Sequence, residues 1–414
     1  MKLASRLTAH YGLVISFTLT TCAFLAVYIR TLFYMAEYPK NTFLSPPESR
    51  FGDMYSTVGP WLESGFSGVG FPFSYFPGMY LLIEVMHNSA SIFNFPGIWV
   101  MMILLFTSIT ISVFFIIGFR NFAICASLIL ILTFSQPSLL IWSTGNLEGY
   151  IAILLLYSFV LFAKKKYLFF TLVISFIASA KLFPAIFILA LLFKMRFISF
   201  LKLAIIFLSF MILVSLSSMA FLKGGFLRSN NSFIDIISFS NESRSLYADL
   251  MYYSEASIPY GHSFLNGVHS IFGMAFLNTR ENMFSVAILL SLIIFIPSLV
   301  IAYKASSHDW VFILILGSWT LSVVPTSTDY RLVYLWPALI MFFKLRFHSI
   351  AHSLIIMWVI VILSPKPYFP TAIHPQAYFQ VYFSAFSLVL IPIFLAVIEI
   401  YSSRKNTSNP LQMR

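Results

Sequence analysis

The stretch "YLFFTLVISFIASAKLFPAIFILALLFKMRF", Tyr167 to Phe197, decides how the chain folds. Basic residues lie at both of its ends, Lys164 to Lys166 before it and Lys194 to Lys202 around its close. Because positively charged loops stay on one side of a membrane, the stretch must cross an even number of times. Pro184, three residues after Lys181, interrupts any helix that runs through this point. The pattern therefore predicts a broken hairpin of two short spans with Lys181 at its turn.

Apolar composition extends this interpretation to the whole chain. Of the 414 residues, 59% are hydrophobic and only 9% are charged, and the mean hydropathy is +0.90. Such a chain has too little polar surface to cover a water-soluble globule of this size. Apolar runs near or above the roughly 20 residues needed to cross a bilayer recur from Gly12 to Ile400. We expect an all-α polytopic membrane protein with about 12 (range 10–13) transmembrane helices.

The basic residues orient this bundle. The net charge is +11, and in a chain of this hydropathy it indicates membrane topology, with no nucleic-acid partner expected. Most Lys and Arg residues fall in short loops with few acids, which places these loops and both termini in the cytoplasm. The expected spans are 13–34, 97–118, 122–142, 149–163, 167–180, 184–194, 198–220, 284–303, 310–324, 332–343, 348–364 and 377–400.

On this topology the outer side has two large loops, about 35–96 and 221–283. We expect interfacial helices in the first of them, including the short apolar segment Phe71 to His87. Residues 1–403 are then a single transmembrane domain, and residues 404–414 are a polar cytoplasmic tail. The lean loops and the Lys- and Phe-rich composition indicate a bacterial inner membrane protein whose outer loops face the periplasm.

Cysteine and histidine spacing suggests neither a disulfide framework nor a metal site. Cys22 and Cys125 lie inside apolar runs, where cysteine behaves as a small hydrophobic residue. The chain also has no Gly-rich phosphate loop. We therefore expect no metal and no cofactor.

Polar residues that remain at the outer side are candidates for function, because ionisable groups near a membrane are costly. Asp53 in "RFGDMYSTVGPW" (Arg50 to Trp61) is either a catalytic carboxylate or a solvated loop acid. Asn146 and Glu148 in "WSTGNLEGY" follow the third span and form either a ligand site or a helix-capping turn. His262, Ser263 and Asn266 in "PYGHSFLNGVHSIF" either orient a polar substrate or cap a turn.

Two cations stand out among these residues. Lys181 lies at the break in the hairpin, where its ammonium either lines a cavity or extends to the membrane surface. Asp329 and Arg331 open the span of "VVPTSTDYRLVYLWPALIMFF", where Arg331 either grips an anion or pairs with Asp329. A face with cations, a carboxylate, amides, hydroxyls and aromatic rings suits a sugar joined to a lipid phosphate.

The order of these motifs resembles the GT-C glycosyltransferases, and within them the GT87 group, which contains polyprenyl-phosphate-mannose and arabinose transferases. The resemblance rests on an acidic first outer loop, "YFPG" (Tyr75 to Gly78), "GN" (Gly145 and Asn146), "AKLFP", "GHSFLNG" and "TSTDYRL", and covers about 1–345. It implies a GT-C type bundle that moves a hexose or pentose, mannose-like by preference, from a polyprenyl-phosphate donor to a hydroxyl of a glycan or glycolipid. The active site faces the periplasm, membrane lipids surround the bundle, and the anomeric carbon is inverted.

The resemblance also implies roles for individual residues. Asp53 is the general base, and Glu48 and Glu63 flank it as substitutes. Lys181 and Arg331 bind the donor phosphate, and the remaining substrate-binding residues are Tyr75, Asn146, Glu148, His262, Ser263, Asn266, Asp329 and Tyr330. The family commonly has "NQS" where this chain has "GHS", so His262 replaces an amide and the family's acceptor specificity is not carried over to this chain.

Two other functions fit parts of the pattern. A transporter or flippase of lipid-linked sugars also has broken helices and intramembrane cations, but the halves of this chain show no repeat. An O-antigen polymerase or ligase also uses lipid-linked sugars, commonly with Arg-rich outer loops. The large late outer loop holds only Arg228, Arg244 and Arg280, which favours the transferase.

Overall fold

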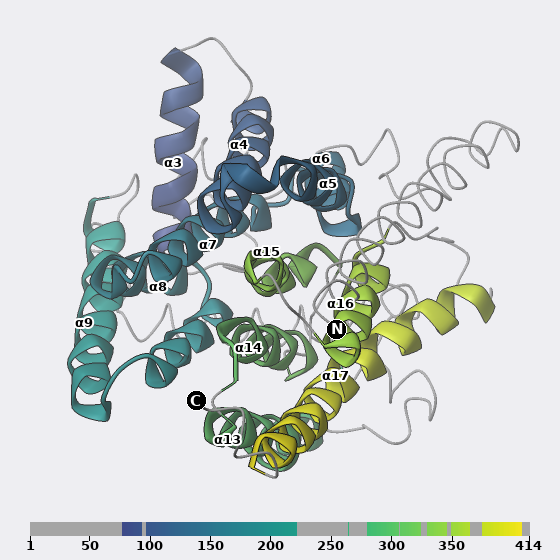
Figure 1. Cartoon of the computed structure of the whole chain (residues 1–414). Helices are drawn as coiled ribbons and strands as arrows, with labels where there is room; N and C mark the ends of the chain where they lie inside the picture. Colours follow the sequence, from purple (N-terminus) through teal and green to yellow (C-terminus); the bar gives the residue numbers. More distant parts are fainter. Residues whose placement is uncertain are drawn as a thin grey trace, which may run out of the picture.

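The structure is a computed structural model that describes residues 77–92, 97–221, 264, 280–305, 307–323, 329–345, 349–364 and 375–407. Every regular element in these ranges is a helix, so the prediction of an all-α fold is confirmed (Figure 1). The helices are α3 (Pro77–Ile92), α4 (Gly97–Ile117), η3 (Phe119–Asn121), α5 (Phe122–Thr133), α6 (Gln136–Thr144), α7 (Glu148–Ala163), α8 (Tyr167–Ala180), η4 (Phe183–Phe193), α9 (Phe197–Phe221), α12 (Arg280–Leu290), η8 (Ser291–Phe295), α13 (Ile296–Lys304), α14 (Asp309–Val323), η9 (Asp329–Leu335), α15 (Trp336–Lys344), α16 (Ile350–Leu363) and α17 (Pro375–Thr407). The segments η3, η4 and η9 are 3-10 helices, and η8 is a π-helical turn.

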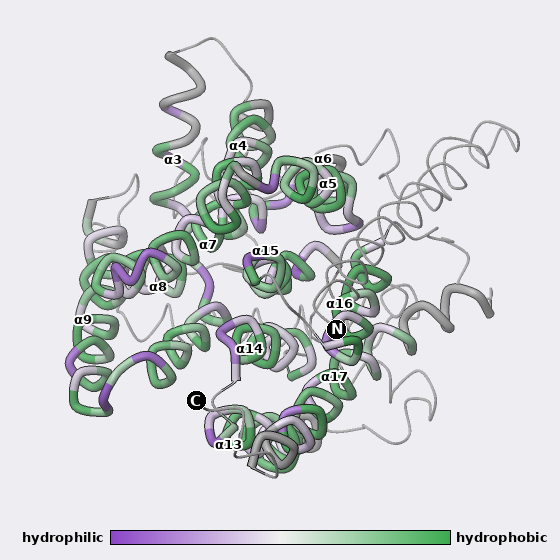
Figure 2. Tube along the Cα trace, viewed as in Figure 1, coloured by the Kyte–Doolittle hydropathy of each residue, from purple (hydrophilic) through white to green (hydrophobic). Residues whose placement is uncertain are grey.

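Several described helices have the length and apolarity of a membrane span. Four qualify, with apolar windows at Val100–Ile117, Phe197–Ser218, Ser285–Lys304 and Phe383–Ser402, and a bent pair, α5 with α6, makes a fifth. Five further apolar helices are shorter: α7, α8, η4, α14 and α16. Figure 2 shows hydrophobic residues along most of the helices, with hydrophilic residues gathered at turns. The membrane character is thus confirmed, whereas the count of about 12 spans stays a prediction.

Proline sets the irregular points of the long segments. The expected span 122–142 is bent by 54° between α5 and α6. Pro137 lacks the N–H that would bond the carbonyl of Thr133, so α5 ends at that residue. Pro297 acts in the same way four residues after Ile293, which lies inside the π-helical turn η8.

The expected break at Lys181 is present. Helix α8 ends at Ala180, Lys181 has an extended backbone (φ −154°, ψ 121°), and η4 starts at Phe183. Pro184 cannot bond the carbonyl of Ala180, which explains why the helix stops there. The two arms α8 and η4 pack against each other, and Tyr167 at the start of α8 interacts electrostatically with Lys194 at the end of η4. The stretch is therefore a hairpin, as its sequence predicts.

Helices α14 and α15 form the centre of the bundle, as Figure 1 shows. Helix α14 packs against α15, α17, α13, η4 and η9. Trp310 and Trp336 are fully buried there, and the rings of Phe193 and Phe312 stack at 3.7 Å between η4 and α14. This central pair fixes the position of η9, which precedes α15 directly.

Candidate functional site

A buried ionic cluster joins three interruptions of the helical fold. Glu148 is the first residue of α7, Lys181 lies between α8 and η4, and Tyr334 belongs to η9. The ammonium of Lys181 pairs with one carboxylate oxygen of Glu148, and the hydroxyl of Tyr334 donates to the other. Glu148 and Tyr334 are 0% exposed and Lys181 is 7% exposed. We call these three residues the Glu148 cluster.

The turn before α7 holds Glu148 in place. Gly145 closes α6 with φ +67°, a left-handed conformation that glycine adopts without strain. The side-chain oxygen of Asn146 then accepts a hydrogen bond from the backbone N–H of Glu148, at 2.9 Å. Asn146 therefore forms a local side-chain turn immediately before α7, whose N-cap is Leu147. Glu148 adds a negative charge at the positive end of the α7 dipole, which stabilises the helix start.

Helix η9 adds a second cation, Arg331, and the aromatic ring of Tyr330. Arg331 is only 7% exposed, and its guanidinium lies 5.2 Å from the centre of the Phe183 ring. The Tyr330 ring centre is 6.0 Å from the ammonium of Lys181. Both contacts have the geometry of cation–π interactions. Two cations and one carboxylate are thus gathered within this described part of the bundle.

The cluster lies deep in the bundle. Gly317, about halfway along α14, packs so closely on η9 that a Cβ there would stand 2.7 Å from the carbonyl oxygen of Tyr334. The ammonium of Lys181 points to Glu148 and is buried in protein, which favours the interpretation that it lines an interior site. A buried ion pair is retained only where both charges keep their partners, because each carries a large desolvation penalty.

The structure brings together five of the expected site residues: Asn146, Glu148, Lys181, Tyr330 and Arg331. Asp329 opens η9, but only its backbone position is described. Asp53, Tyr75, His262, Ser263 and Asn266 lie outside the described residues. Their roles stay predictions.

Tyr334 is a site residue that the sequence interpretation misses. It stands inside "YRLVYLWP", where it looks like one more aromatic residue of an apolar span. The signal that could have found it is its spacing from Arg331. Residues three apart eclipse each other in a 3-10 helix, so Tyr334 lies on the same face of η9 as Arg331.

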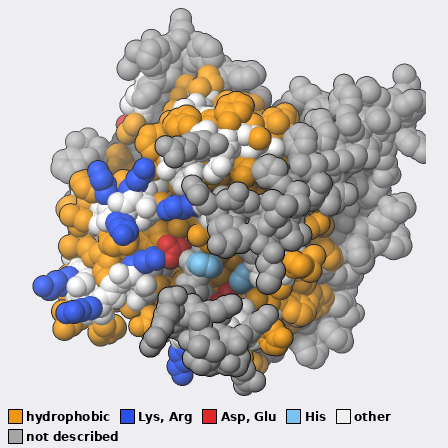
Figure 3. All heavy atoms as spheres, in the orientation of Figure 1, with side chains coloured by type: hydrophobic (Ala, Val, Ile, Leu, Met, Phe, Trp, Pro, Cys, Tyr) orange, Lys and Arg blue, Asp and Glu red, His pale blue; other side chains and the backbone are white. Residues whose placement is uncertain are grey.

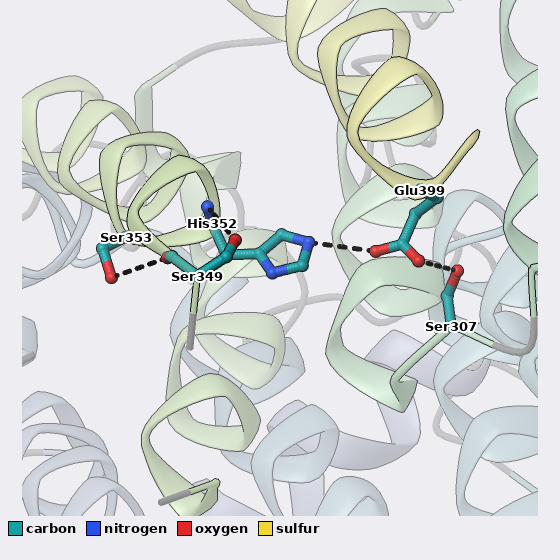
Figure 4. Close-up of polar contacts among 5 residues, drawn as sticks. All are labelled: Ser307, Ser349, His352, Ser353 and Glu399. Carbon is teal, nitrogen blue, oxygen red and sulfur yellow. Dashed lines mark hydrogen bonds and ion pairs between the residues drawn. The ribbon is translucent and has the colours of Figure 1, made fainter. Parts of the chain in front are cut away.

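A second polar cluster lies where α14 begins (Figure 4). Glu399 of α17 accepts a hydrogen bond from Ser307 at 2.7 Å, and its other oxygen lies 3.0 Å from Nε2 of His352 on α16. The carboxylate stands between the serine and the histidine, so His352 is not placed to activate Ser307 as a nucleophile. The rings of Trp310 and His352 pack edge to face, with their centroids 5.3 Å apart. We interpret this cluster as a connection between α16, α17 and the start of α14.

The fold and the site define a polytopic helical membrane protein with a buried ionic cluster at its helix breaks. The family model for Glycosyltransferase family 87 matches residues 72–328, which is more than half of the chain. The chain belongs to this family and is a membrane glycosyltransferase, with a sugar donor and an acceptor as substrates. No curated protein matches the chain. The matched region contains Glu148 and Lys181 and ends one residue before η9.

Proposed function

We propose that this glycosyltransferase uses a polyprenyl-phosphate sugar as donor and a hydroxyl of a glycan or glycolipid as acceptor. The sugar is a hexose or pentose, mannose-like by preference, and transfer takes place at the periplasmic face of a bacterial inner membrane. The observation that carries the proposal is the pair of buried cations, Lys181 and Arg331, at adjoining helix interruptions around Glu148. Buried cations held this way are suited to a phosphate that enters from the lipid phase.

Lys181 and Arg331 differ in how they would hold that phosphate. The guanidinium offers a planar pair of N–H donors that matches two phosphate oxygens. The ammonium of Lys181 is a point charge whose position is set by Glu148, and the attraction of the carboxylate offsets the desolvation penalty of burying it. On donor binding Lys181 shares its N–H groups between Glu148 and the phosphate. The face of Tyr330 beside it supplies an aromatic surface for the sugar ring.

The transfer step is a single displacement. Asp53 removes the proton of the acceptor hydroxyl, and the hydroxyl oxygen bonds to the anomeric carbon from the side opposite the phosphate. The bond between the anomeric carbon and the phosphate oxygen breaks, and its electron pair stays on that oxygen. The configuration at the anomeric carbon is inverted, and the added charge of the leaving phosphate is stabilised by Lys181 and Arg331. Atoms and charge balance in this step without a cofactor.

The remaining predicted residues would shape the two substrates. Tyr75, His262, Ser263, Asn266 and Asp329 supply aromatic, hydroxyl, amide and carboxylate groups of the kinds that bind sugar hydroxyls. Since the donor is anchored in the bilayer by its lipid, proximity comes from the membrane and not from a nucleotide-binding domain.

The test uses purified protein with a radiolabelled polyprenyl-phosphate hexose and a candidate acceptor glycan. We expect Asp53→Asn to bind the donor normally and to lose transfer by about 10²-fold or more, because a missing general base costs this much. Asp309→Asn, which removes an acid paired with Lys194 at the start of α14, is the matched control and should transfer normally.

Donor binding tests the phosphate site separately. Arg331→Ala should weaken donor binding, while Lys344→Ala, an exposed cation at the end of α15, should not. Normal transfer by Asp53→Asn would overturn the base assignment. Movement of the labelled lipid across the membrane by a wild-type protein that transfers no sugar would favour a transporter.

A further inference from the structure

A second charged feature lies outside the proposed donor site. Six cations gather at two turns and in the helix after the second: Lys164, Lys165 and Lys166 between α7 and α8, Lys194 and Arg196 between η4 and α9, and Lys202 in the second turn of α9. Figure 3 shows Lys and Arg side chains collected over the α8 and α9 side of the molecule. All six side chains are exposed, and among the described residues only Lys194 of the six has an acidic partner, Asp309. We call these six residues the basic patch.

The hairpin explains why the two turns are neighbours. Helix η4 packs against α8, and helices α8 and α9 are themselves in contact. The two helices pack along each other, and Tyr167 after the first turn interacts with Lys194 before the second. The basic patch is therefore one surface and not two separate loops.

Exposed apolar side chains continue directly from the cations. Leu168 and Phe169 follow the first turn on α8, and Phe197, Ile198 and Leu201 follow the second on α9. Farther along α9 the exposed apolar surface continues with Ile205, Leu208 and Ile212. Only 11% of the apolar window of α9 is buried inside the protein. Charge at one end and a long apolar face behind it match the two parts of a phospholipid.

The turn at Lys165 carries an unusual backbone conformation. Lys165 has φ +60°, the left-handed region that glycine favours after a helix, and among the described residues it is the one non-glycine with positive φ. Its N–H bonds the carbonyl of Phe162 and that of Lys166 bonds Leu161, which is the pattern of a helix end closed by a left-handed residue. A lysine in this place keeps a third charge on the turn at the expense of an easier conformation.

We propose that the basic patch is a binding site for the anionic headgroup of a membrane phospholipid, whose acyl chains lie along the apolar face of α9. The phosphate of the headgroup is held by the lysines of the first turn together with Arg196 of the second turn and Lys202 of α9. This lipid is structural and distinct from the sugar donor, so the site does not depend on the proposed transfer reaction.

The experiment measures lipid binding by the full chain in a neutral detergent. Phosphatidylglycerol or phosphatidylcholine is added stepwise, and bound lipid is counted by native mass spectrometry while the unfolding temperature is recorded. We expect phosphatidylglycerol to bind and to raise the unfolding temperature, and the effect to weaken with salt because headgroup contacts are screened. Phosphatidylcholine, which has no net charge, should do neither.

Variants locate the site. Lys165→Gly combined with Lys202→Gln removes one charge from the first turn and one from the start of α9, and should weaken phosphatidylglycerol binding by about tenfold or more. Because glycine suits φ +60°, the first substitution should not lower the unfolding temperature in detergent alone. Lys202→Arg keeps the charge and should bind as the wild type does. Lys304→Gln with Lys344→Gln removes two exposed lysines elsewhere and should also bind normally.

Three outcomes would overturn the proposal. Equal binding of phosphatidylglycerol and phosphatidylcholine would show that the protein does not recognise the charge of the headgroup. Equal binding by the Lys165→Gly/Lys202→Gln variant and the wild type, or an equal loss in the Lys304→Gln/Lys344→Gln control, would show that the basic patch is not the site. Full competition by glycerol 3-phosphate at the lipid's own concentration would show a free-anion site with no role for α9.

Discussion

Replacing Glu148 by glutamine tests the buried ionic cluster. The side chain of Glu148 is 0% exposed and that of Lys181 is 9% exposed, so solvent screens their attraction very little. Glutamine has the same shape, and its carbonyl can still accept the hydrogen bond of Tyr334. What is lost is the negative charge opposite a buried ammonium. Breaking a buried pair from one side costs about 3–5 kcal/mol, and we expect a loss of about 3 kcal/mol in the free energy of unfolding.

The ion pair between Lys194 and Asp309 provides the comparison. Its side chains, at the end of η4 and at the start of α14, are 30% and 31% exposed. Water therefore stabilises either charge when its partner is removed, and such pairs contribute about 0–1 kcal/mol. Denaturant unfolding in detergent micelles, followed by tryptophan fluorescence, should separate Glu148→Gln from Asp309→Asn by about 2 kcal/mol or more.

A double variant identifies the cause of the loss. Glu148→Gln with Lys181→Met removes both charges and should recover most of the stability, because no buried charge is left without its counterion. If Glu148→Gln were as stable as the wild type, or no worse than Asp309→Asn, the pair would not be buried as described. If the double variant were as unstable as Glu148→Gln alone, the loss would come from shape and not from charge.

Three further predictions concern packing and hydrogen bonding. Gly317→Ala places a Cβ 2.7 Å from a backbone carbonyl oxygen of η9, so η9 must move. We expect a clear loss of transfer activity together with a small drop in the unfolding temperature. Tyr334→Phe removes the hydroxyl that donates to the Glu148 carboxylate and should cost about 2 kcal/mol in denaturant unfolding, since hydrogen bonds to charged groups contribute this much. Glu399→Gln weakens the contact with His352 and should lower the free energy of unfolding by about 1 kcal/mol, as measured by denaturant unfolding. Binding of the polyprenyl-phosphate sugar donor should be unchanged.

The break at Lys181 is the backbone irregularity that the sequence predicts. Pro184 and the basic residues on both sides place the break at Lys181, because proline removes a specific hydrogen bond of the helix. The same rule applies to Pro137, yet the expected span 122–142 was taken as one helix although the chain bends there by 54°. The sequence prediction gave the total length of the apolar run more weight than the polar residues around Pro137, Ser135, Gln136 and Ser138, which lie at the bend.

The sequence predicts that the charged candidates gather at one face of the membrane, but it does not predict which of them pair. Glu148, Lys181 and Arg331 are conspicuous because charge is rare in this chain. Their pairing depends on how α7, α8 and η9 pack, and local patterns carry no information on contacts between residues 33 or 186 positions apart. Tyr334 was missed for the same reason, because its role depends on the hydrogen bond that its hydroxyl donates to Glu148, far away in the sequence.

The meeting of three irregular segments has a common physical reason. A backbone that leaves the helical pattern in a membrane must be buried in protein or line a cavity, because lipid cannot satisfy its N–H and C=O groups. Helices α6 and α7, which flank the first turn, both pack against the 3-10 helix η9. Glu148 at the start of α7 binds Lys181 at the break and Tyr334 of η9. Each irregular segment thus gives the others a polar neighbour, and Glu148 links all three. A donor phosphate that entered here would meet backbone and side-chain groups that the fold has already withdrawn from lipid, which is the condition for binding a charged headgroup inside an apolar bundle.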